Sequence, residues 1–386
     1  MKIIEVNSEK DKKAFFDTAR SIYKNDKNWT CPLDIELDAI FDPVENTCFR
    51  NGEAIRWVLM DAKNNPIGRI AAFIDYNKVN THEQPSGGVG FFECIDDQST
   101  ANLLFDTAKV WLQERKMEAM DGPINFGENY MNWGLLVEGF MHQGYGMQYH
   151  HAYYKKLFEN YGFKLYFSQL SYHLDPKDFP IERFSKITEW SEKRGGFSYK
   201  QFEYTDIDKF VDDFIIIFSR VWQSFKKDYA PVDRKDILKM FNSAKPIIDK
   251  RLIWFAYHND KPIAMIAMFP DVNQILKKMN GKLHFINKLK FAWLKWRKTM
   301  KRARVILIGV VPEFQKSGLE AGMITKLSHV FLSGEYTELE ISWVGDFNNK
   351  MRKMAESINS KHVKTHATYR FMFDRNKEFK RYPMGV

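Results

Sequence analysis

The stretch Gly309-Val-Val-Pro-Glu-Phe-Gln-Lys-Ser-Gly-Leu-Glu-Ala-Gly322 decides the fold of this chain. It follows the β-branched apolar run Arg304–Ile308, which predicts a buried strand. It precedes Met323–Leu332, where apolar residues recur at helical spacing. A strand, a short glycine-bearing loop and a helix start leave unpaired N–H groups at the positive end of a helix dipole. The stretch therefore predicts a loop that holds a phosphate group.

The segment Val310–Ala321 resembles the acyl-CoA-binding motif of the GNAT superfamily of N-acyltransferases, which reads V-x-P-x-x-[Q/R]-x-x-G-x-[G/A]. The resemblance implies that backbone amides of the loop hold the pyrophosphate of an acyl-CoA. Glu320 stands where the motif has a small residue, and a carboxylate near a pyrophosphate is unfavourable unless it points away. The residues implied for acyl-CoA binding are Gly309, Val310, Val311, Gln315, Lys316, Ser317, Gly318, Leu319, Ala321 and Asn349.

Composition indicates a globular protein of a reducing compartment. The chain has 386 residues, enough for two domains, with 44% hydrophobic and 28% charged residues. Its three cysteines, Cys31, Cys48 and Cys94, form no C-x-x-C pair, so we expect neither a disulfide framework nor a zinc site. No secretory signal is visible, and no run reaches the roughly 18 apolar residues of a membrane span. We therefore expect a cytoplasmic protein.

Two pieces of the chain match each other. Asn65–Phe73 and Lys261–Phe269 share Pro, two Ile, Ala and Phe at corresponding positions. Each follows an apolar run and a polar turn, which predicts a β-hairpin. Downstream, both copies repeat the order strand, helix, strand, helix, strand. The sequence therefore predicts a duplication into residues 1–175 and 176–386.

This repeated order is that of a GNAT fold, and blocks outside the loop resemble a bacterial tandem-GNAT family. They include Gly90–Asp97, Gly134–Phe140 and Glu340–Trp343, and the resemblance covers nearly the whole chain. It implies an α/β (α+β) fold of two tandem GNAT domains, each a mixed, mostly antiparallel sheet flanked by helices. The segment Glu93–Thr100 has no glycine and carries three acids, so only the C-terminal domain is expected to bind CoA.

The second copy carries a basic insertion, residues 272–304. Between Val272 and Pro312 there are eleven Lys or Arg and no Asp or Glu, in a chain whose net charge is +9. The insertion predicts an amphipathic helix with a basic face opposite an apolar one. The apolar face comprises Phe285, Ile286, Leu289, Ala292, Trp293, Trp296 and Met300.

Residues 283–302 resemble helices that lie in a membrane interface, because a basic face is backed by an apolar stripe with two tryptophans. This interpretation predicts an anionic membrane as partner and a peripheral position at the inner membrane face. Two others stay open: a helix packed on the core with a solvated basic face, and a site for another acidic partner. Nucleic acid is disfavoured, since the basicity is confined to one segment.

Acyl transfer to an amine needs one group that removes the amine proton and one that protonates the leaving thiolate. Glu340 shares its strand face with Glu338 and Ser342 by period two, and it is the candidate general base. The alternative is that these residues face outward on a half-exposed strand. The family's usual donor is a Tyr in the helix after its Asn; no Tyr follows Asn349 there, so Tyr369 is the candidate replacement.

The candidate contacts of the acceptor substrate are Glu93, Asn125, Asn129, Tyr154 and Trp343, each weighed against a structural role. The pair His150-His151 suggests a metal, but adjacent residues on a helix diverge by about 100°. No third ligand lies nearby in the sequence, so we expect no metal.

We therefore expect an N-acyltransferase that moves an acyl group from acyl-CoA, either acetyl-CoA or a longer thioester, to an amine. The acceptor is expected to be a lipid or amphipathic amine, as for the GNAT-like bacterial ceramide synthases. Two alternatives stay open. One is a Fem-like aminoacyl transferase, and the other is a degenerate GNAT that binds acyl-CoA or lipid without catalysis. The acceptor's identity, the acyl length and the oligomeric state are left open by the sequence.

Overall fold

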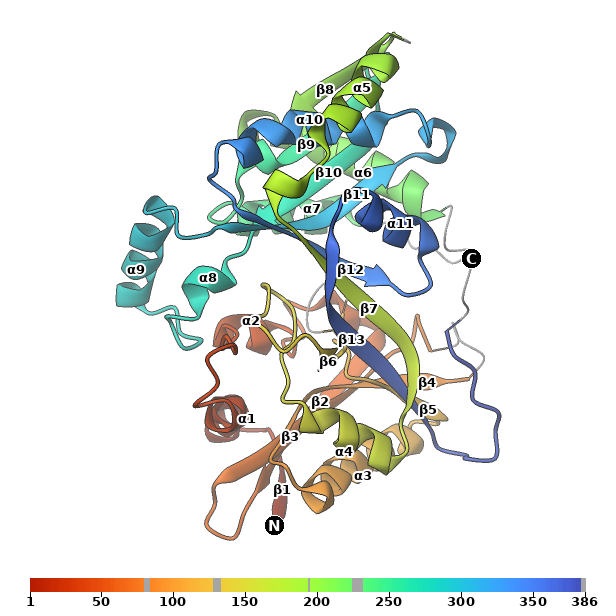
Figure 1. The fold of residues 1–386 in the computed structure, drawn as a ribbon. Coiled ribbons are helices and arrows are strands. Elements are labelled where there is room, and N and C mark those ends of the chain that lie inside the picture. The colour runs from red at the N-terminus through yellow and green to blue at the C-terminus, as the bar shows by residue number, and fades with distance from the viewer. Residues whose placement is uncertain (80–83, 128–132, 194, 224–231, 383–386) are drawn as a thin grey trace.

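The computed structural model describes residues 1–79, 84–127, 133–193, 195–223 and 232–382. Figure 1 shows two halves, one above the other, joined in the middle by long strands. These strands are β7 (Lys164–Leu174), β12 (Glu338–Gly345) and β13 (Lys361–Met372).

The N-terminal half begins with a short strand and two helices, and its sheet follows. Its elements before β7 are β1 (Lys2–Glu5), α1 (Glu9–Ile22), α2 (Asp34–Ala39), η1 (Thr47–Asn51), β2 (Gly52–Met60), β3 (Pro66–Asp75), β4 (Ser86–Cys94), α3 (Gln98–Glu114), β5 (Ala119–Gly122), β6 (Leu135–Glu138) and α4 (Tyr153–Tyr161).

The C-terminal half repeats this order with additions. Its elements besides β12 and β13 are η2 (Pro176–Asp178), α5 (Ile181–Glu192), β8 (Phe197–Gln201), η3 (Tyr204–Asp206), α6 (Ile207–Gln223), α7 (Arg234–Ala244), η4 (Lys250–Leu252), β9 (Ile253–His258), β10 (Lys261–Pro270), α8 (Asn273–Leu276), α9 (Phe285–Trp296), β11 (Arg302–Val310), η5 (Pro312–Phe314), α10 (Leu319–Leu332) and α11 (Asn349–Ser357).

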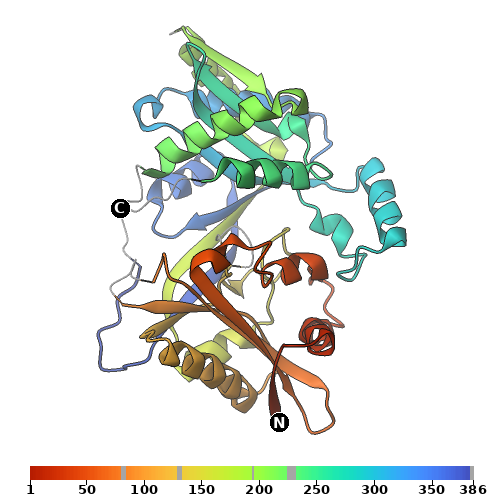
Figure 2. The same cartoon turned by 180° about the vertical axis from the view of Figure 1, so that it is seen from behind.

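The repeated element order is confirmed, and so is the fold class. Local sequence signals fix several of the boundaries. Ser8 and Asp11 form a capping box at α1, and Asp97 caps α3 by accepting from the N–H of Thr100. Among the elements that the sequence did not predict are α2, α5, β6 and β8. Figures 1 and 2 show that α5 and α10 cover one face of the upper sheet, while α6 and α7 cover the other.

One sheet runs through both halves, in the order β1-β2-β3-β4-β5-β13-β7-β12-β11-β10-β9-β8. β7 pairs with β12 of the later half, and β13 pairs with β5 of the earlier half. β7 and β13 also pair with each other along most of their length. The two halves therefore exchange their last strands and share the centre of the sheet. The division at residues 175 and 176 stays a prediction.

Each half has its own apolar core, made where helices pack on the sheet. In the N-terminal half, the buried rings of Phe92 and Phe105 stack with centroids 4.5 Å apart, and Phe158 packs on both. In the C-terminal half, buried Phe255 and Leu327 belong to a larger cluster between the sheet and its helices. These cores lie on either side of the shared strands, toward the two ends of the sheet.

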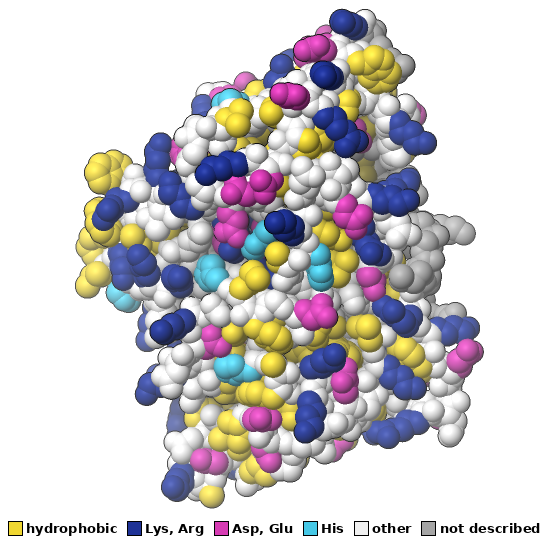
Figure 3. Space-filling model, in the orientation of Figure 1, with side chains coloured by type: hydrophobic (Ala, Val, Ile, Leu, Met, Phe, Trp, Pro, Cys, Tyr) yellow, Lys and Arg dark blue, Asp and Glu magenta, His cyan; other side chains and the backbone are white. Residues whose placement is uncertain are grey.

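α8 and α9 lie between β10 and β11, where the N-terminal half has only a short connection. They project from the side of the molecule (Figure 1), and Figure 3 shows hydrophobic and basic side chains together on this projection. α9 ends at Trp296, whereas the sequence predicted a helix that extends to Met300. Met300 is buried, so it does not join the apolar side chains that α9 exposes.

Candidate functional site

Two neighbouring parallel strands stop pairing in the C-terminal half. β11 and β12 pair only between Arg302–Val305 and Glu338–Ile341. Beyond these residues β11 and β12 do not pair with each other. The pairing of β12 with β7 is irregular between Ile341 and Val344. We call residues 306–310 of β11 and 342–345 of β12 the strand fork. Ile306 in the fork is 41% exposed, so an apolar strand residue there lacks the cover that a neighbouring strand would give.

The predicted phosphate loop follows the fork directly. The N–H of Val311 donates to Ile263 O at 2.9 Å, which ties the end of β11 to the neighbouring strand. Lys316 and Gly318 then take left-handed backbone conformations, with φ of 65° and 85°. α10 begins with the bond from Gly322 N–H to Gly318 O. The loop thus turns sharply from the strand into the helix, as the sequence predicts.

The first turn of α10 leaves hydrogen-bond donors free. Within the part of the chain that the structure describes, the N–H groups of Gly318, Leu319 and Ala321 have no acceptor. Unpaired N–H groups at the start of a helix favour an anion. These groups therefore suit a pyrophosphate.

Neighbouring side chains leave little room for a Cβ at two positions, one in the loop and one in the first turn of α10. A Cβ at Gly318 would lie 3.1 Å from Cγ2 of Ile187 and 3.3 Å from Cβ of Ser191, both on α5. A Cβ at Gly322 would lie 2.0 Å from the Tyr199 hydroxyl oxygen. A side chain at either position would thus have to displace its neighbours.

Glu320 is the unfavourable feature of the loop. Burial raises the pKa of its carboxyl group, and a bond from its own N–H partly offsets this. The carboxylate therefore engages one donor of the first helical turn and adds negative charge beside the others.

We expect Glu320→Gln to tighten CoA binding. A charge at the first turn of a helix contributes about 0.3–1 kcal/mol, so the affinity should rise roughly two- to fivefold. Isothermal titration with CoA measures the change, and Glu313→Gln, an exposed change in the same loop region, is the control. Weaker binding by Glu320→Gln would show that the carboxylate supports the loop.

Behind the fork lies a network of buried charges centred on Glu340, which is fully buried. Its carboxylate accepts from Lys364 Nζ at 2.9 Å and from His173 Nε2 at 2.7 Å. The Ser342 hydroxyl donates to Glu340 at 2.9 Å and accepts from Arg304 Nε at 2.7 Å. Three strands other than β12 supply the partners: β7, β11 and β13. The exchanged strands thus complete this network.

The network keeps Glu340 ionised. Burial alone would raise the pKa of this carboxyl group, but Lys364, His173 and Arg302 outweigh burial and hold the pKa well below its usual value. His173 Nδ1 also lies 3.0 Å from Glu338. Burial would lower the pKa of His173, but its bonds to Glu338 and Glu340 raise it. The sequence predicted that Glu338, Glu340 and Ser342 share a strand face, and their common partners agree.

The raised pKa of His173 predicts a pH-dependent stability. A group with a raised folded pKa stabilises the protein below its unfolded pKa, and this contribution is lost as the pH rises through the folded pKa. Wild type should therefore exceed His173→Gln in unfolding free energy most at about pH 6 and least at about pH 9. Urea unfolding at both values tests this, with exposed His329→Gln as the control. An equal difference at both pH values would contradict the charged state of His173.

The other candidate residues lie in several places. Tyr369 is buried in the N-terminal core, where its hydroxyl lies 3.3 Å from Glu159 Oε1, and it is not brought together with Glu340. Asn349 is exposed at the start of α11. Trp343 lies in the fork with its ring 6.0 Å from that of Trp133. The acyl-transfer roles predicted for these residues stay predictions.

The matching fork of the N-terminal half is filled by the chain itself. β4 and β5 pair only over Ser86–Gly88 and Ala119–Asp121. Beyond that point, the N–H of Ile124 donates to Val89 O at 2.9 Å. A Cβ at Gly90 would lie 2.0 Å from Ile124 O. This closure agrees with the absence of a CoA motif from the first copy.

The predicted acceptor contacts in the N-terminal half form a buried cluster. Glu93 accepts from the hydroxyl groups of Tyr23 and Tyr154, both at 2.7 Å, and lies 3.5 Å from Arg69. Burial raises the pKa of Glu93, although these partners act to lower it. Asn125 is partly buried, and Asn129 lies outside the described residues. This cluster supports the N-terminal core, and its contact with an acceptor stays a prediction.

Histidine and cysteine form no metal site in the described ranges, where no group of three or more His, Cys, Asp or Glu could hold an ion. His150 is buried and accepts from the N–H of Leu136 at 3.1 Å. The ring of His151 instead lies against that of Tyr23, with centroids 4.7 Å apart. The three cysteines are free.

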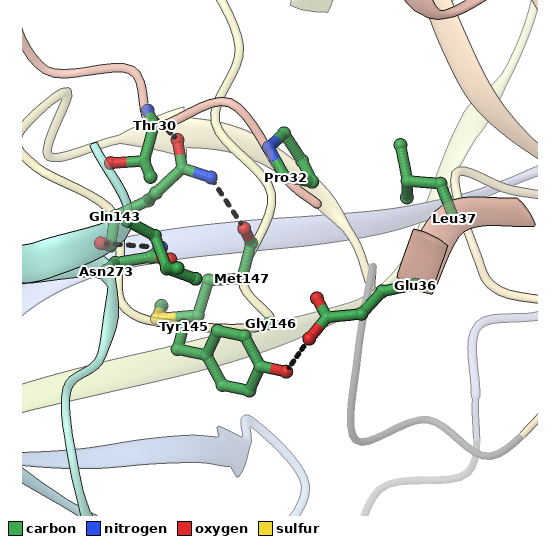
Figure 4. A pocket seen from close by; sticks show the side chains of 10 residues that line it. Thr30, Pro32, Glu36, Leu37, Gln143, Tyr145, Gly146, Met147 and Asn273 are labelled. Atoms are coloured by element: carbon green, nitrogen blue, oxygen red, sulfur yellow. Dashed lines mark hydrogen bonds between the residues drawn. The ribbon is translucent and has the colours of Figure 1, made fainter. Parts of the chain in front are cut away.

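A small pocket lies where α2, the loop around Tyr145 and α8 meet (Figure 4). Its volume is about 20 Å³, room for about one water molecule. Gln143 accepts from the N–H of Thr30 at 3.1 Å and from Asn273 Nδ2 at 3.3 Å, and Tyr145 donates to Glu36 at 2.5 Å. The hydrogen bond from Asn273 to Gln143 therefore anchors α8 on the N-terminal half. The pocket itself is too small for a substrate.

Comparison with solved structures identifies the fold. No family model matches the chain. A tandem GNAT protein from the clavulanic acid biosynthesis pathway matches with a TM-score of 0.57, covering 97% of this chain and 99% of that chain at 9% identity. The chain has the fold of a tandem GNAT protein.

Two relatives align with this chain over nearly its whole length. The bacterial ceramide synthase of Caulobacter vibrioides is 29% identical over 384 residues, covering 96% of this chain and 97% of the relative. Protein YghO of Escherichia coli K12 is 26% identical over 375 residues, covering 94% of this chain and 93% of the relative. The chain is therefore homologous to a bacterial ceramide synthase. Among its described residues, no helix is both long and apolar enough to cross a membrane.

Proposed function

We propose that this tandem GNAT protein is an N-acyltransferase that moves an acyl group from acyl-CoA to the amine of a long-chain, lipid-like acceptor. The observation that carries the proposal is its end-to-end homology to a bacterial ceramide synthase. A ceramide is the amide of a fatty acid and a long-chain amino alcohol, so that name implies this chemistry. The acceptor is drawn from a membrane, at its cytoplasmic face.

The C-terminal half would bind the acyl-CoA. The free N–H groups of Gly318, Leu319 and Ala321 fit its pyrophosphate, with Gln315 and Lys316 beside them. Asn349 begins the helix that follows β12, and the loop follows β11. Because these two strands are parallel, both lie at the same edge of the sheet.

In the proposed reaction, the amine nitrogen attacks the thioester carbonyl carbon and the bond from carbon to sulfur breaks. The amine loses a proton and the thiolate gains one, so the products are an amide and free CoA thiol. Backbone N–H groups near Gly309–Val311 are proposed to polarise the carbonyl oxygen.

An apolar surface near the fork suits a long hydrocarbon chain. Ile306 is exposed in the fork. On α6, the rings of Phe214, Phe218 and Trp222 stack in sequence, with centroids 5.4 and 4.3 Å apart. Val221 of the same helix lies 3.4 Å from the position of a Cβ at Gly309. We propose that an acyl or acceptor chain lies along the fork at Ile306, near the partly buried rings of Phe218 and Trp222.

Glu340 is proposed to act through Ser342. A fully buried carboxylate with a strongly lowered pKa is a poor proton acceptor near neutral pH, where an efficient base has a matched pKa. Its bond to the Ser342 hydroxyl holds the first residue of the fork in β12. Glu340 is thus a positioning residue for the fork.

The test is amine-dependent release of CoA thiol from palmitoyl-CoA. Release should occur with sphinganine, a long-chain amino alcohol, and should exceed release with glucosamine, a water-soluble amine. Greater release with glucosamine would contradict a lipid-like acceptor.

A second candidate is a protein that binds acyl-CoA without catalysis, which the Glu320 carboxylate beside the loop favours. Tight binding of acyl-CoA with no thiol release for any amine would support this candidate over acyl transfer.

A further inference from the structure

α9 presents its apolar face to the outside of the protein. Its side chains of Phe285, Ile286, Leu289, Trp293 and Trp296 are between 51% and 79% exposed. A surface helix of a globular protein normally turns such a face toward the core. Figure 3 shows the hydrophobic side chains gathered on this projection.

The inner face of α9 is held by a few specific contacts. Asn287 is buried and donates through Nδ2 to Lys282 O at 2.7 Å and to Met279 O at 3.2 Å. Leu294 is buried in a cluster with Ile275 and Leu276 of α8. Because Asn287 and Leu294 face inward, the orientation of α9 is fixed and its apolar face stays outward.

Basic side chains surround the exposed apolar face. Those exposed on α9 and just after it are Lys288, Lys295, Arg297 and Lys298, and Lys277, Lys278 and Lys282 are exposed in the preceding segment. Glu335 pairs with Lys298 at 3.3 Å. Two of the eleven basic residues, Arg302 and Arg304, belong instead to the buried network. The surface around α9 still carries an excess of positive charge over a compact area.

We propose that α9 docks this protein on an anionic lipid surface, with its five exposed apolar side chains below the headgroups and the surrounding lysines and arginine at the phosphates. An anionic interface satisfies both the apolar stripe and the charge around it. A second copy of α9 would bring like charges together. A nucleic acid would pair with the cations and leave Ile286 and Leu289 in water.

The insertion that carries α8 and α9 is attached to both halves of the protein. The N–H of Tyr145 donates to Asp271 at 2.9 Å, and Asn273 donates to Gln143, so the root of the insertion is fixed on the N-terminal half. Asp271 also pairs with Arg302 of the network behind the fork, at 3.3 Å. Docking of α9 would therefore fix the orientation of both halves on the membrane.

Vesicle co-sedimentation without acyl-CoA or amine tests the docking directly. The full chain should sediment with phosphatidylcholine vesicles containing phosphatidylglycerol, and at least about tenfold less with phosphatidylcholine alone. Trp293→Glu/Trp296→Glu should reduce binding to the anionic vesicles by at least about tenfold. Val110→Glu/Leu332→Glu, which places acids at two exposed apolar positions elsewhere, should bind like wild type.

The contrary outcomes are equally definite. Equal recovery on both lipids, or unchanged binding of the double tryptophan variant, would overturn the proposal. The proposal would also be overturned if the protein bound neither vesicle but bound RNA in a salt-sensitive way. It would likewise be overturned if the protein bound neither vesicle and formed a dimer that was lost in the double tryptophan variant. Vesicle binding by a protein that releases no CoA thiol would count against the proposed acyl transfer and leave the docking intact.

Discussion

Gly318→Gln is expected to weaken CoA binding at least about a hundredfold. The new side chain would occupy the approach to the N–H groups of Gly318, Leu319 and Ala321, and each charge-assisted hydrogen bond lost costs about 1.5–3 kcal/mol. Isothermal titration of the purified variant with CoA measures the effect.

Gly334→Gln is the matched control for backbone strain. Gly334 also has a left-handed backbone, with φ of 73° against 85° for Gly318, and nothing lies within 4 Å of its absent Cβ. Gly334 follows the C-terminal end of α10. A glutamine there would therefore have the same left-handed backbone strain as one at Gly318, but it would lie far from the phosphate loop. A comparable loss of affinity in both variants would show that strain, and not the loop, accounts for the effect.

The second large effect is expected at the buried charges. Glu340→Gln leaves the fully buried Lys364 ammonium without its carboxylate, and breaking a buried pair this way costs about 3–5 kcal/mol of unfolding free energy. Lys364→Met should cost less, because Glu340 keeps His173 and Arg302 as partners. The double variant should be more stable than Glu340→Gln alone. Urea unfolding of the three variants measures the order.

Exposed Lys239 and Glu45 provide the control pair, with their charged atoms 2.7 Å apart. Lys239→Met should change the unfolding free energy by less than about 1 kcal/mol. A cost for Lys364→Met equal to or above that for Glu340→Gln would contradict the network as described. Where Glu340→Gln is folded, kcat should fall roughly a hundredfold with little change in KM, because the fork is misplaced.

Local sequence patterns were enough to predict most elements of both halves, but α2, α5, β6 and β8 were not predicted. The loop around Gly318 follows from a β-branched strand, a glycine and a helical pattern, each visible within about ten residues. The repeat at Pro66 and Pro262 then predicts the same order twice, and a tandem GNAT fold follows.

Long-range pairing could not be predicted in the same way. The period-two pattern places Glu340 and Ser342 on one face, but Lys364 and His173 reach them through the exchange of β13 and β7. No local signal specifies that exchange. Likewise, a helical wheel shows that α9 has two faces, while the inward position of Asn287 decides which one is exposed.

The central claim is that this chain forms an amide between an acyl chain and a long-chain amine. The direct measurement is mass spectrometry of the lipid product after incubation of the full chain with isotope-labelled palmitoyl-CoA and sphinganine. The account predicts a labelled N-palmitoyl amide that Gly318→Gln does not produce and Gly334→Gln does. Labelled free palmitate as the only product, or an equal yield of amide from Gly318→Gln, would contradict it.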